Sequence, residues 1–369
     1  MRYYIIAGEA SGDLHGSNLI HALHQQDNHA VIRCWGGDKM EKAGATLVTH
    51  YRNLAFMGFA EVIKNLPTIL RNLRFCKNDI EAFCPDVLIC IDYPGFNLRI
   101  AKWAHQKGIR VVYYIAPQVW AWKENRVKGM KKCIDQLLVI LPFEKEFFAS
   151  RWNWPVSYVG HPLVQVVADA KKQPNDRPLA DRPIVALLPG SRQQEIAKKL
   201  PIMLQVTTYF PDHQFIVAKA PGTPEAFYTN LLAGHPTVQS VSDQTYSLLR
   251  QAKAALVTSG TATLETALFG VRQVVCYKGS WLSYQIGKRL VNIKFISLVN
   301  LILNKAAIKE LIQDDLTLEN LKAALQELLF DREKQQQIDT DYAQLHQLLG
   351  GSGQASVQAA ALIVAGIKK

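Results

Sequence analysis

Short apolar runs alternate with stretches of helical periodicity along most of the chain. In the first half, the apolar runs cover residues 3–7, 31–35, 87–92, 111–115, 137–140 and 157–159. Between several of them, apolar residues recur at the spacing of one helix face, as in 14–23, 96–107 and 144–152. This alternation predicts right-handed β-α-β units and a largely parallel sheet.

The same pattern restarts after residues 171–183, a stretch with three prolines and mixed charge that is typical of a linker. The second set of apolar runs covers 184–188, 214–218, 237–241, 254–258 and 273–277, with helical patterns at 195–210 and 261–269. From Leu318 onward the tail has helical periodicity, which Gly350, Gly351 and Gly353 interrupt.

We therefore expect an α/β protein with two doubly wound, Rossmann-like domains that face a central cleft. The expected parts are a first domain at 1–170, the linker at 171–183, a second domain at 184–345, and a C-terminal helix at 346–369. We expect this last helix to cross back and pack on the first domain. In such folds, ligands bind beyond the carboxyl ends of the strands, so the chemistry should lie in those loops.

Composition narrows the class of protein. Of the 369 residues, 49% are hydrophobic and 20% charged, which suits a globular chain with substantial cores. The formal charge of +11 is compatible with phosphates, anionic lipid surfaces or nucleic acid. No basic stripe with stacking aromatics and no nucleic-acid-binding motif occurs, so we expect no nucleic-acid partner.

The six cysteines are scattered without C-x-x-C spacing, as expected of buried thiols in a reducing compartment. No signal-peptide pattern and no uncharged apolar stretch of about 18 residues is evident, so we expect a cytoplasmic protein, at most peripheral to a membrane. The D-x-D pair Asp339 and Asp341 lies in the tail, away from any strand end. We expect no metal and no cofactor. For His161, a role as a hinge residue and a role in catalysis fit the sequence equally well.

The first strand-to-helix turn has the sequence GEASGD, residues 8–13. A helix that starts here offers unpaired N–H groups to an anionic or polyhydroxyl ligand. Gly8, Gly12 and Gly16 are four residues apart, which does not fit G-x-G-x-x-G, and no P-loop lysine follows. The turn therefore argues against both NAD and ATP.

Two turns in the second half are suited to a nucleoside diphosphate. In LPGSR, Gly190 and Ser191 allow close approach of a phosphate to a helix N-terminus, and Arg192 adds a charge. In SGTATLE, hydroxyls and N–H groups precede Glu265, which could accept both hydroxyls of a ribose. The alternatives are an ordinary turn with a solvated arginine and simple helix capping by Thr261 and Thr263.

In the first half, Asp92 ends a buried strand and precedes Tyr93 and Pro94. A carboxylate at that place can act as a general base on a hydroxyl nucleophile, or it can cap the following helix. These two interpretations are evenly balanced on the local sequence.

Two apolar segments are flanked by basic residues. Phe56, Met57 and Phe59 form one of them, and Trp120 and Trp122 belong to the other. Such segments suit a protein that touches an anionic membrane or takes up acyl chains, and burial in the core explains them equally well.

Seven motifs together resemble the lipid-A-disaccharide synthase family: GEASGD at 8–13, MGFAEV at 57–62, IDYPGFN at 91–97, APQVWAW at 116–122, VGHPL at 159–163, LPGSR at 188–192 and SGTATLE at 259–265. The resemblance implies an inverting GT-B glycosyltransferase. It implies that UDP-2,3-diacylglucosamine is joined to 2,3-diacylglucosamine 1-phosphate, giving a β(1→6) disaccharide and UDP. It also implies peripheral association with the inner membrane of a Gram-negative cell, and a homodimer.

The resemblance also implies roles for individual residues. Asp92 matches the base that acts on the acceptor hydroxyl, while the turn at 8–13 would face the acceptor through Glu9, Ser11, Gly12 and Asp13. The implied UDP contacts are Gly190, Ser191, Arg192, Ser259, Thr261, Ala262, Thr263, Glu265, Asn300 and Gln313. Arg192 and two helix N-termini would then stabilise the departing diphosphate without a metal.

Three other hypotheses for the function remain open. The same architecture serves UDP-GlcNAc 2-epimerases and the transferase that completes the peptidoglycan lipid precursor. A non-catalytic acyl-lipid carrier at the membrane surface is the third. The apolar segment with Phe56, Met57 and Phe59 argues against the epimerase.

Overall fold

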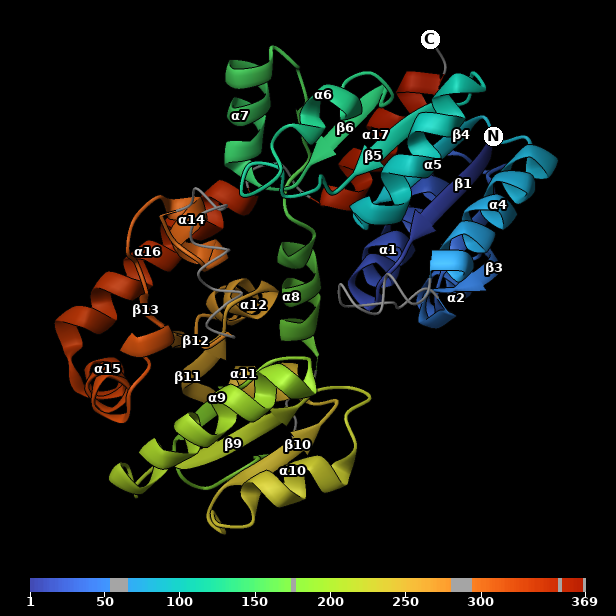
Figure 1. Ribbon diagram of the computed structural model, residues 1–369. Helices are drawn as coiled ribbons and strands as arrows, with labels where there is room; N and C mark the ends of the chain where they lie inside the picture. Colours follow the sequence, from blue (N-terminus) through green and yellow to red (C-terminus); the bar gives the residue numbers. More distant parts are fainter. Residues whose placement is uncertain (54–65, 174–176, 280–293, 351–353, 368–369) are drawn as a thin grey trace. The chain divides into compact units, whose positions relative to one another are not determined.

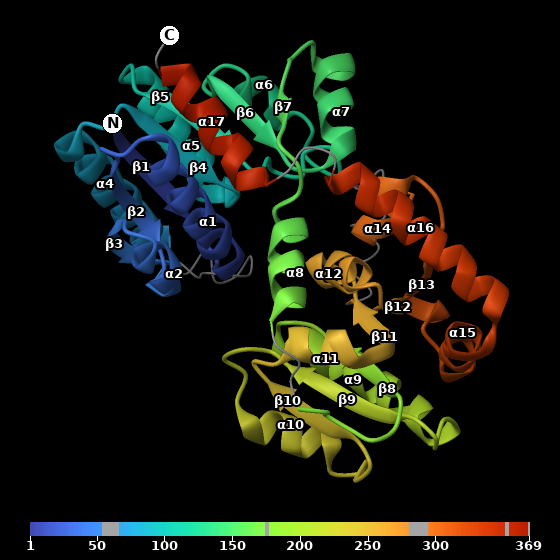
Figure 2. The same cartoon turned by 180° about the vertical axis from the view of Figure 1, so that it is seen from behind.

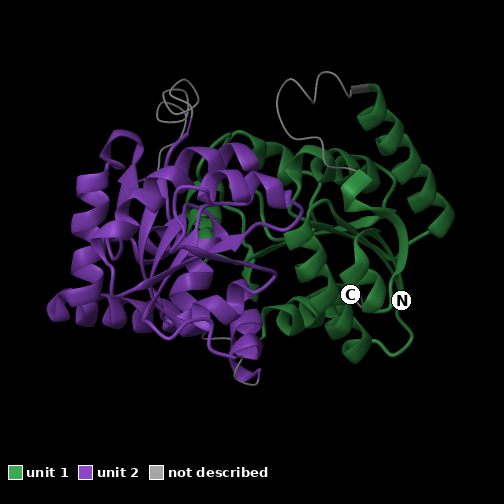
Figure 3. Cartoon of the chain, turned by 90° about the horizontal axis from the view of Figure 1, so that it is seen from below, with its two compact units in different colours: residues 1–162, 349–369 green, residues 163–348 purple. Residues whose placement is uncertain are grey.

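The computed structural model describes residues 1–53, 66–173, 177–279, 294–350 and 354–367. The chain divides into two units, which are coloured separately in Figure 3. Unit 1 comprises Met1–Pro162 and Leu349–Lys369, and unit 2 comprises Leu163–Leu348. Each unit is described by itself below.

Within the described residues, unit 1 contains a seven-stranded sheet in the order β3-β2-β1-β4-β5-β6-β7, and every neighbouring pair is parallel (Figure 1). The strands are β1 (Arg2–Ala7), β2 (Val31–Gly36), β3 (Thr46–His50), β4 (Val87–Ile91), β5 (Arg110–Tyr114), β6 (Gln136–Val139) and β7 (Ser157–Tyr158). The helices are α1 (Ala10–Gln26), α2 (Asp38–Lys42), α4 (Leu66–Phe83), α5 (Pro94–Gln106), α6 (Arg126–Met130), α7 (Pro142–Trp152) and α17 (Ala355–Ile367), with a 3-10 turn at Tyr51–Asn53.

Both faces of this sheet are covered, because successive side chains of each strand point to opposite sides. Tyr4 and Ile6 of β1 pack into one core cluster, whereas Tyr3, Ile5 and Ala7 pack into the other. The second cluster includes Ala359, Ala360, Ile363 and Val364 of α17, which lies beside α1 in Figures 1 and 2. The C-terminal helix is therefore part of the core of unit 1.

Unit 2 contains, within its described residues, a six-stranded sheet in the order β10-β9-β8-β11-β12-β13, again with parallel neighbours only. The strands are β8 (Ile184–Leu188), β9 (Gln214–Lys219), β10 (Gln239–Ser242), β11 (Ala252–Thr258), β12 (Arg272–Tyr277) and β13 (Lys309–Ile312). The helices are α8 (Pro162–Lys172), α9 (Gln193–Gln205), α10 (Glu225–Leu232), α11 (Thr245–Gln251), α12 (Thr261–Phe269), α14 (Leu298–Leu303), α15 (Leu318–Phe330) and α16 (Arg332–Gly350), and 3-10 turns cover Val206–Tyr209 and Gln313–Asp315.

The strand order locates the ligand sites in both units. In unit 1 the order reverses direction between β1 and β4, and in unit 2 it reverses between β8 and β11. At such a switch point the loops diverge to opposite faces and leave a crevice beyond the strand ends. The residues that follow β1, β4, β8 and β11 are therefore the ones to examine.

The predicted strands are present, but the strands at the sheet edges were not all predicted. β3 and β13 did not appear as apolar runs, since their residues are partly exposed. Unit 1 ends at Pro162, before the expected boundary at 170, because α8 packs within unit 2, where Lys171 Nζ donates to the carbonyl oxygen of Leu268 at 2.7 Å.

By length and composition alone, the stretch Arg332–Ile367 could cross a membrane, and 47% of its most apolar window is buried inside the protein. The core helix of a soluble protein passes the same test. Since Ala359, Ala360 and Ile363 of α17 are fully buried in unit 1, the apolar character of this stretch is explained by packing.

Candidate active site

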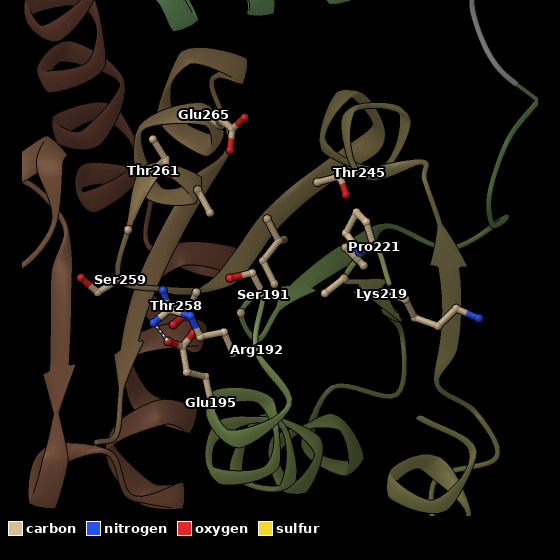
Figure 4. Close-up of a pocket in the computed structure, with 16 residues that line it drawn as sticks. Ser191, Arg192, Glu195, Lys219, Pro221, Thr245, Thr258, Ser259, Thr261 and Glu265 are labelled. Carbon is tan, nitrogen blue, oxygen red and sulfur yellow. Dashed lines mark hydrogen bonds and ion pairs between the residues drawn. The ribbon is translucent and has the colours of Figure 1, made fainter. Parts of the chain in front are cut away.

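A pocket of about 480 Å³ lies at the switch point of unit 2 (Figure 4). It is bounded by the loops that follow β8, β9 and β11 and by the start of α11, so residues from four separate β-α connections meet there. Its lining residues are Leu188, Gly190, Ser191, Arg192, Glu195, Ala218, Lys219, Ala220, Pro221, Thr245, Thr258, Ser259, Gly260, Thr261, Ala262 and Glu265. Both sequence motifs proposed for a nucleoside diphosphate contribute to this one pocket.

The first wall is the turn between β8 and α9. Gly190 has φ +132°, a backbone conformation that residues with a side chain rarely adopt. Arg192 is the N-cap residue of α9, so the free N–H groups of the first helical turn start at the pocket. Its side chain is exposed and pairs with Glu195 at 3.3 Å between Nη1 and Oε1 (Figure 4). The turn therefore combines helix-end N–H groups with a guanidinium.

The second wall is the turn between β11 and α12. Gly260 is the N-cap residue of α12 with φ +146°, and Thr261 starts the helix with an exposed side chain. Ser259 lines the pocket while its hydroxyl donates to the carbonyl oxygen of Ile296 at 2.8 Å. The N-terminus of α12 thus adds a second set of unpaired N–H groups to the same pocket.

Thr263 plays a different part from its neighbours. It is fully buried, and its Oγ1 donates to the carbonyl oxygen of Gly260 at 2.8 Å. The residue does not line the pocket. Its hydroxyl is therefore used in a bond to the backbone three residues back and does not cap α12, whose N-cap residue is Gly260.

Glu265 lies one turn into α12 and contributes a carboxylate to the pocket. Burial raises the pKa of this carboxyl, and the hydroxyl of Tyr246 opposes that shift by donating a hydrogen bond of 2.6 Å to Oε1. Tyr246 belongs to α11, so two helices fix the direction of one carboxylate. A carboxylate held in this way is suited to accept hydrogen bonds from vicinal hydroxyls.

The sequence motifs did not include several polar residues of this pocket. Lys219 follows from β9 and pairs with Glu225 at 2.8 Å, and Thr245 comes from the start of α11. Behind the lining, Lys199 of α9 is buried and donates to the hydroxyl of Thr258. Only Lys199 has a signal in the sequence, as a charged residue on the otherwise apolar face of a helix.

Asn300 and Gln313 do not line the pocket. Asn300 is buried and joins α14 to β13, with its Nδ2 donating to the carbonyl oxygen of Ile308 and to Glu310, both at 2.9 Å. Gln313 follows β13 with φ +55°, and its Oε1 accepts from the backbone N–H of Gly279 at 3.0 Å. In this structure both side chains hold neighbouring segments of unit 2.

In unit 1, Asp92 directly follows β4 at the switch point between β1 and β4. Burial raises the pKa of its carboxyl to about 6, and the negative charge of Glu9, the N-cap residue of α1, acts in the same direction. Glu9 and Asp92 are thus close enough for their charges to interact, where the ends of β1 and β4 lie side by side. An aspartate with a pKa near neutrality is a competent general base.

The backbone of Asp92 is held in a left-handed conformation, with φ +43°, and Tyr93 follows with φ +49°. Two donors fix the carbonyl oxygen of Asp92: Nδ2 of Asn97 at 2.8 Å and the hydroxyl of Tyr113 at 2.7 Å. Asn97 also donates to the carbonyl oxygens of Ile6 and Ile91. One buried amide therefore clamps the ends of β1 and β4 under the candidate base.

The turn at 8–13 is divided between surface and core. Glu9 and Ser11 are exposed, whereas Gly12 and Asp13 are buried. The carboxylate of Asp13 accepts from the backbone N–H groups of Gly37, Lys39 and Met40 at 2.8, 3.2 and 3.1 Å. Asp13 therefore caps the start of α2, and this occupies the carboxylate that we expected to face the acceptor.

Further titratable groups are buried in unit 1. Burial raises the pKa of Glu144 to about 7, and this carboxylate accepts from Nε1 of Trp120 at 3.1 Å and from the backbone of Ile140 and Leu141. Burial lowers the pKa of His15 to about 4 and that of His161 to about 3, so both imidazoles are neutral at pH 7. His161 therefore has the character of a buried neutral residue.

A family model for lipid-A-disaccharide synthetase matches residues 3–364. Curated relatives include the lipid-A-disaccharide synthase of Geobacter sulfurreducens, 37% identical over 95% of this chain and 94% of the relative. That of Psychromonas ingrahamii is 39% identical over 95% and 94%. The chain belongs to the lipid-A-disaccharide synthetase family. The family predicted from the seven motifs is thus confirmed, as is the prediction of an enzyme.

Solved structures of low sequence identity share the fold. A kitacinnamycin glycotransferase superposes with a TM-score of 0.70 at 15% identity, covering 99% of each chain. UDP-GlcNAc 2-epimerase from Neisseria meningitidis, bound to UDP-GlcNAc, gives 0.69 at 13% identity, covering 99% of this chain and 100% of the epimerase. These likenesses confirm the predicted fold class of two parallel-sheet α/β domains, the GT-B architecture.

For this member of the lipid-A-disaccharide synthetase family, Gly190, Ser191, Arg192, Ser259, Thr261, Ala262 and Glu265 are brought together by the structure. Phe56, Met57 and Phe59 lie outside the described residues, so their contact with membrane or acyl chains stays a prediction. Among the described residues, no group of three His, Cys, Asp or Glu side chains could hold a metal ion.

Proposed function

We propose that this enzyme transfers a 2,3-diacylglucosamine unit from UDP to the 6-hydroxyl of 2,3-diacylglucosamine 1-phosphate. The bond between the anomeric carbon and the diphosphate breaks, and a β(1→6) bond to the acceptor oxygen forms. Asp92 takes the proton of the attacking hydroxyl, and UDP leaves. The relatives, named lipid-A-disaccharide synthases, support this assignment.

The pocket of unit 2 is the donor site in this proposal. A departing diphosphate carries at least two negative charges, and in this proposal they are stabilised by the N-termini of α9 and α12 and by the guanidinium of Arg192, which all border the pocket. Glu265 accepts the ribose hydroxyls. The observation that carries the proposal is that both predicted turns line one pocket at the switch point of the unit 2 sheet.

Asp92 is the base in this proposal. Its pKa of about 6 leaves the carboxylate ionised at pH 7 and still basic enough to assist deprotonation of a hydroxyl in the transition state. Glu9 and Ser11, exposed at the start of α1, are the nearest candidates on unit 1 for contacts with the acceptor sugar.

The deciding experiment incubates the purified full-length chain with UDP-2,3-diacylglucosamine and 2,3-diacylglucosamine 1-phosphate and analyses the products by mass spectrometry. Formation of a tetraacyl disaccharide 1-phosphate together with UDP supports the proposal. If UDP-GlcNAc is isomerised and no disaccharide forms, the epimerase is the right reading. If the lipids bind and are recovered unchanged, the chain is a carrier.

We also propose that the enzyme works at the inner-membrane surface, as a peripheral protein and as a homodimer. Acylated substrates require access to a lipid surface, and Trp122 is 44% exposed with the ammonium of Lys123 4.3 Å and the guanidinium carbon of Arg126 5.5 Å from its ring centre. Such a cationic aromatic group suits lipid phosphates. Trp120, by contrast, is tied to Glu144.

Co-sedimentation with vesicles of anionic phospholipid tests the membrane contact. We expect Phe56→Ser combined with Phe59→Ser to reduce binding, and Trp122→Ser to do so separately. Undiminished binding of all variants would argue against both patches. Light scattering at several protein concentrations tests the homodimer.

A further inference from the structure

One lysine of unit 2 is buried directly behind the phosphate-binding turn. Lys199 of α9 is 3% exposed. Its ammonium donates to Oγ1 of Thr258, the last residue of β11, and lies 3.9 Å from Oε2 of Glu195. Both partners line the pocket. The charge of Lys199 therefore reaches the floor of the pocket without being part of its exposed lining.

The turn itself passes over this ammonium. A Cβ placed on Gly190 would be 3.5 Å from Nζ of Lys199 and 3.0 Å from Oε2 of Glu195. The absence of a side chain at Gly190 thus permits the closest approach of the turn to both charged groups. A phosphate bound at the N–H groups of this turn would feel the charges of Glu195 and Lys199 at short range.

A buried ammonium at this position is costly to stability. Burial lowers the pKa of Lys199, against the raising effect of Glu195. An apolar residue would fit the surroundings, which include the buried side chains of Ile196 and Leu200 on the same helix. Charged groups kept in such places against their solvation cost are concentrated at functional sites.

Glu195 is shared between two cations. Its Oε1 lies 3.3 Å from Nη1 of Arg192, and its Oε2 faces Lys199. If Arg192 turns from Glu195 to a diphosphate, the glutamate would remain as an unpaired negative charge beside the phosphates, unless another cation compensates it. The ammonium of Lys199 lies close enough to Glu195 to neutralise this charge.

We propose that Lys199 is a positioning residue of the donor site: it neutralises Glu195, so that Arg192 is released to the diphosphate of the nucleotide. This rests on the proposed function, since it needs unit 2 to bind a nucleoside diphosphate. Lys199 itself stays under the turn and holds Thr258 and Glu195 in place. Its effect is confined to the phosphate end of the ligand.

The test compares the affinities of UDP and uridine by titration calorimetry, because only UDP carries the phosphates. In Lys199→Met, Arg192 stays committed to Glu195, so we expect UDP to bind about tenfold more weakly and uridine as in the parent. Lys199→Gln can still donate to Thr258 but carries no charge, and we expect the same loss. Lys198→Met is the matched control, since Lys198 is exposed on the same helix.

A double variant tests the mechanism further. In Lys199→Met combined with Glu195→Gln, no carboxylate competes for Arg192, so UDP affinity should recover relative to Lys199→Met alone. Parent-like UDP affinity in both single lysine variants, an equal loss for uridine, or no recovery in the double variant would each overturn the proposal. If the parent binds no UDP, the assignment of unit 2 as donor site is wrong as well. Thermal unfolding of each variant verifies that it is folded.

Discussion

The hydroxyl of Tyr246 donates a hydrogen bond of 2.6 Å to Oε1 of Glu265. Tyr246 lies in α11 and Glu265 in α12, so the bond connects the two helices at the edge of the pocket. The tyrosine leaves the other carboxylate oxygen available and favours the ionised form against the effect of burial. The carboxylate is therefore already oriented for the ribose contact that we propose.

From this contact we predict a loss of sugar discrimination in Tyr246→Phe. Without the hydroxyl, Glu265 is less ordered and its pKa rises further, so the preference for UDP over 2′-deoxy-UDP should fall by about fivefold. Competition binding with the two nucleotides measures the ratio. Tyr209→Phe is a suitable control because Tyr209 is exposed in the same unit. An unchanged ratio would show that Tyr246 does not direct Glu265.

The second prediction concerns the pH dependence of transfer. Asp92 must be ionised to accept a proton, and its pKa is raised to about 6. The rate should therefore fall as the pH is lowered through about 6 and should level off above pH 7. Initial rates between pH 5 and pH 8 with saturating substrates measure this fall in rate at low pH. If the transfer rate instead fell only near pH 4, the usual range of an aspartate pKa, the environment assigned to Asp92 would be contradicted.

The third prediction separates catalysis from stability at the same residue. Asp92→Asn should lower the transfer rate by at least about a hundredfold and leave UDP affinity unchanged, because the proposed nucleotide site belongs to unit 2. Since the folded state raises the pKa of Asp92 from 3.8 to about 6, it disfavours the charged form; this cost is fully present above pH 6, shrinks as the pH falls below 6 and vanishes only below the unfolded value of 3.8.

The asparagine variant should therefore unfold at a higher temperature than the parent at pH 8, and the difference should be clearly smaller at pH 4.5, which lies between the folded and the unfolded pKa. Thermal unfolding at the two pH values measures the difference. A variant that is less stable than the parent at pH 8 would mean that the Asp92 carboxylate is needed for the fold.

The two sheets and the turns that line the pocket of unit 2 were largely predictable, while the supporting contacts were not. The strand β4 is an apolar run between turn residues, and LPGSR and SGTATLE stand at strand ends, so local pattern was sufficient. Thr263 and Asp13 show the limit of motif reasoning. Whether a hydroxyl or carboxylate faces a ligand or bonds to the backbone depends on which backbone groups lie next to it.

Contacts between residues far apart in the sequence account for the other features that the sequence did not predict. Lys199 meets Thr258 across 59 residues of sequence, and Asn97 meets Ile6 across 91. β13 pairs with β12 in the sheet. Because its residues are partly exposed, it does not form an apolar run in the sequence and was not predicted. Such contacts are set by the packing of the sheet, which a single sequence does not display.

The fourth prediction tests the clamp under Asp92. In Asn97→Ala, the carbonyl oxygens of Ile6, Ile91 and Asp92 lose a buried donor, which should lower the free energy of unfolding by about 2 kcal/mol. The left-handed turn at Asp92 also loses support, so the transfer rate should fall while UDP affinity is kept. Asn78→Ala, exposed on α4, serves as control. A parent-like rate in Asn97→Ala would show that the clamp does not position the base.

The fifth prediction concerns the contact between Gly8 and Tyr93. A Cβ on Gly8 would lie 2.3 Å from Cδ1 of the Tyr93 ring, so Gly8→Ala must displace the ring next to Asp92. We expect a loss of about 1–3 kcal/mol in the free energy of unfolding, and a lower transfer rate with unchanged UDP affinity. Denaturant unfolding and initial rates measure the two effects.

Gly95 provides the matched control for this substitution. It lies two residues beyond Tyr93, within the first turn of α5, and a Cβ there would meet nothing within 4 Å. Gly95→Ala should therefore keep the parent rate, and the higher helix propensity of alanine should make the variant slightly more stable. If Gly8→Ala and Gly95→Ala lowered the transfer rate equally, the close approach of Tyr93 to the end of β1 could not be the reason for a glycine at position 8.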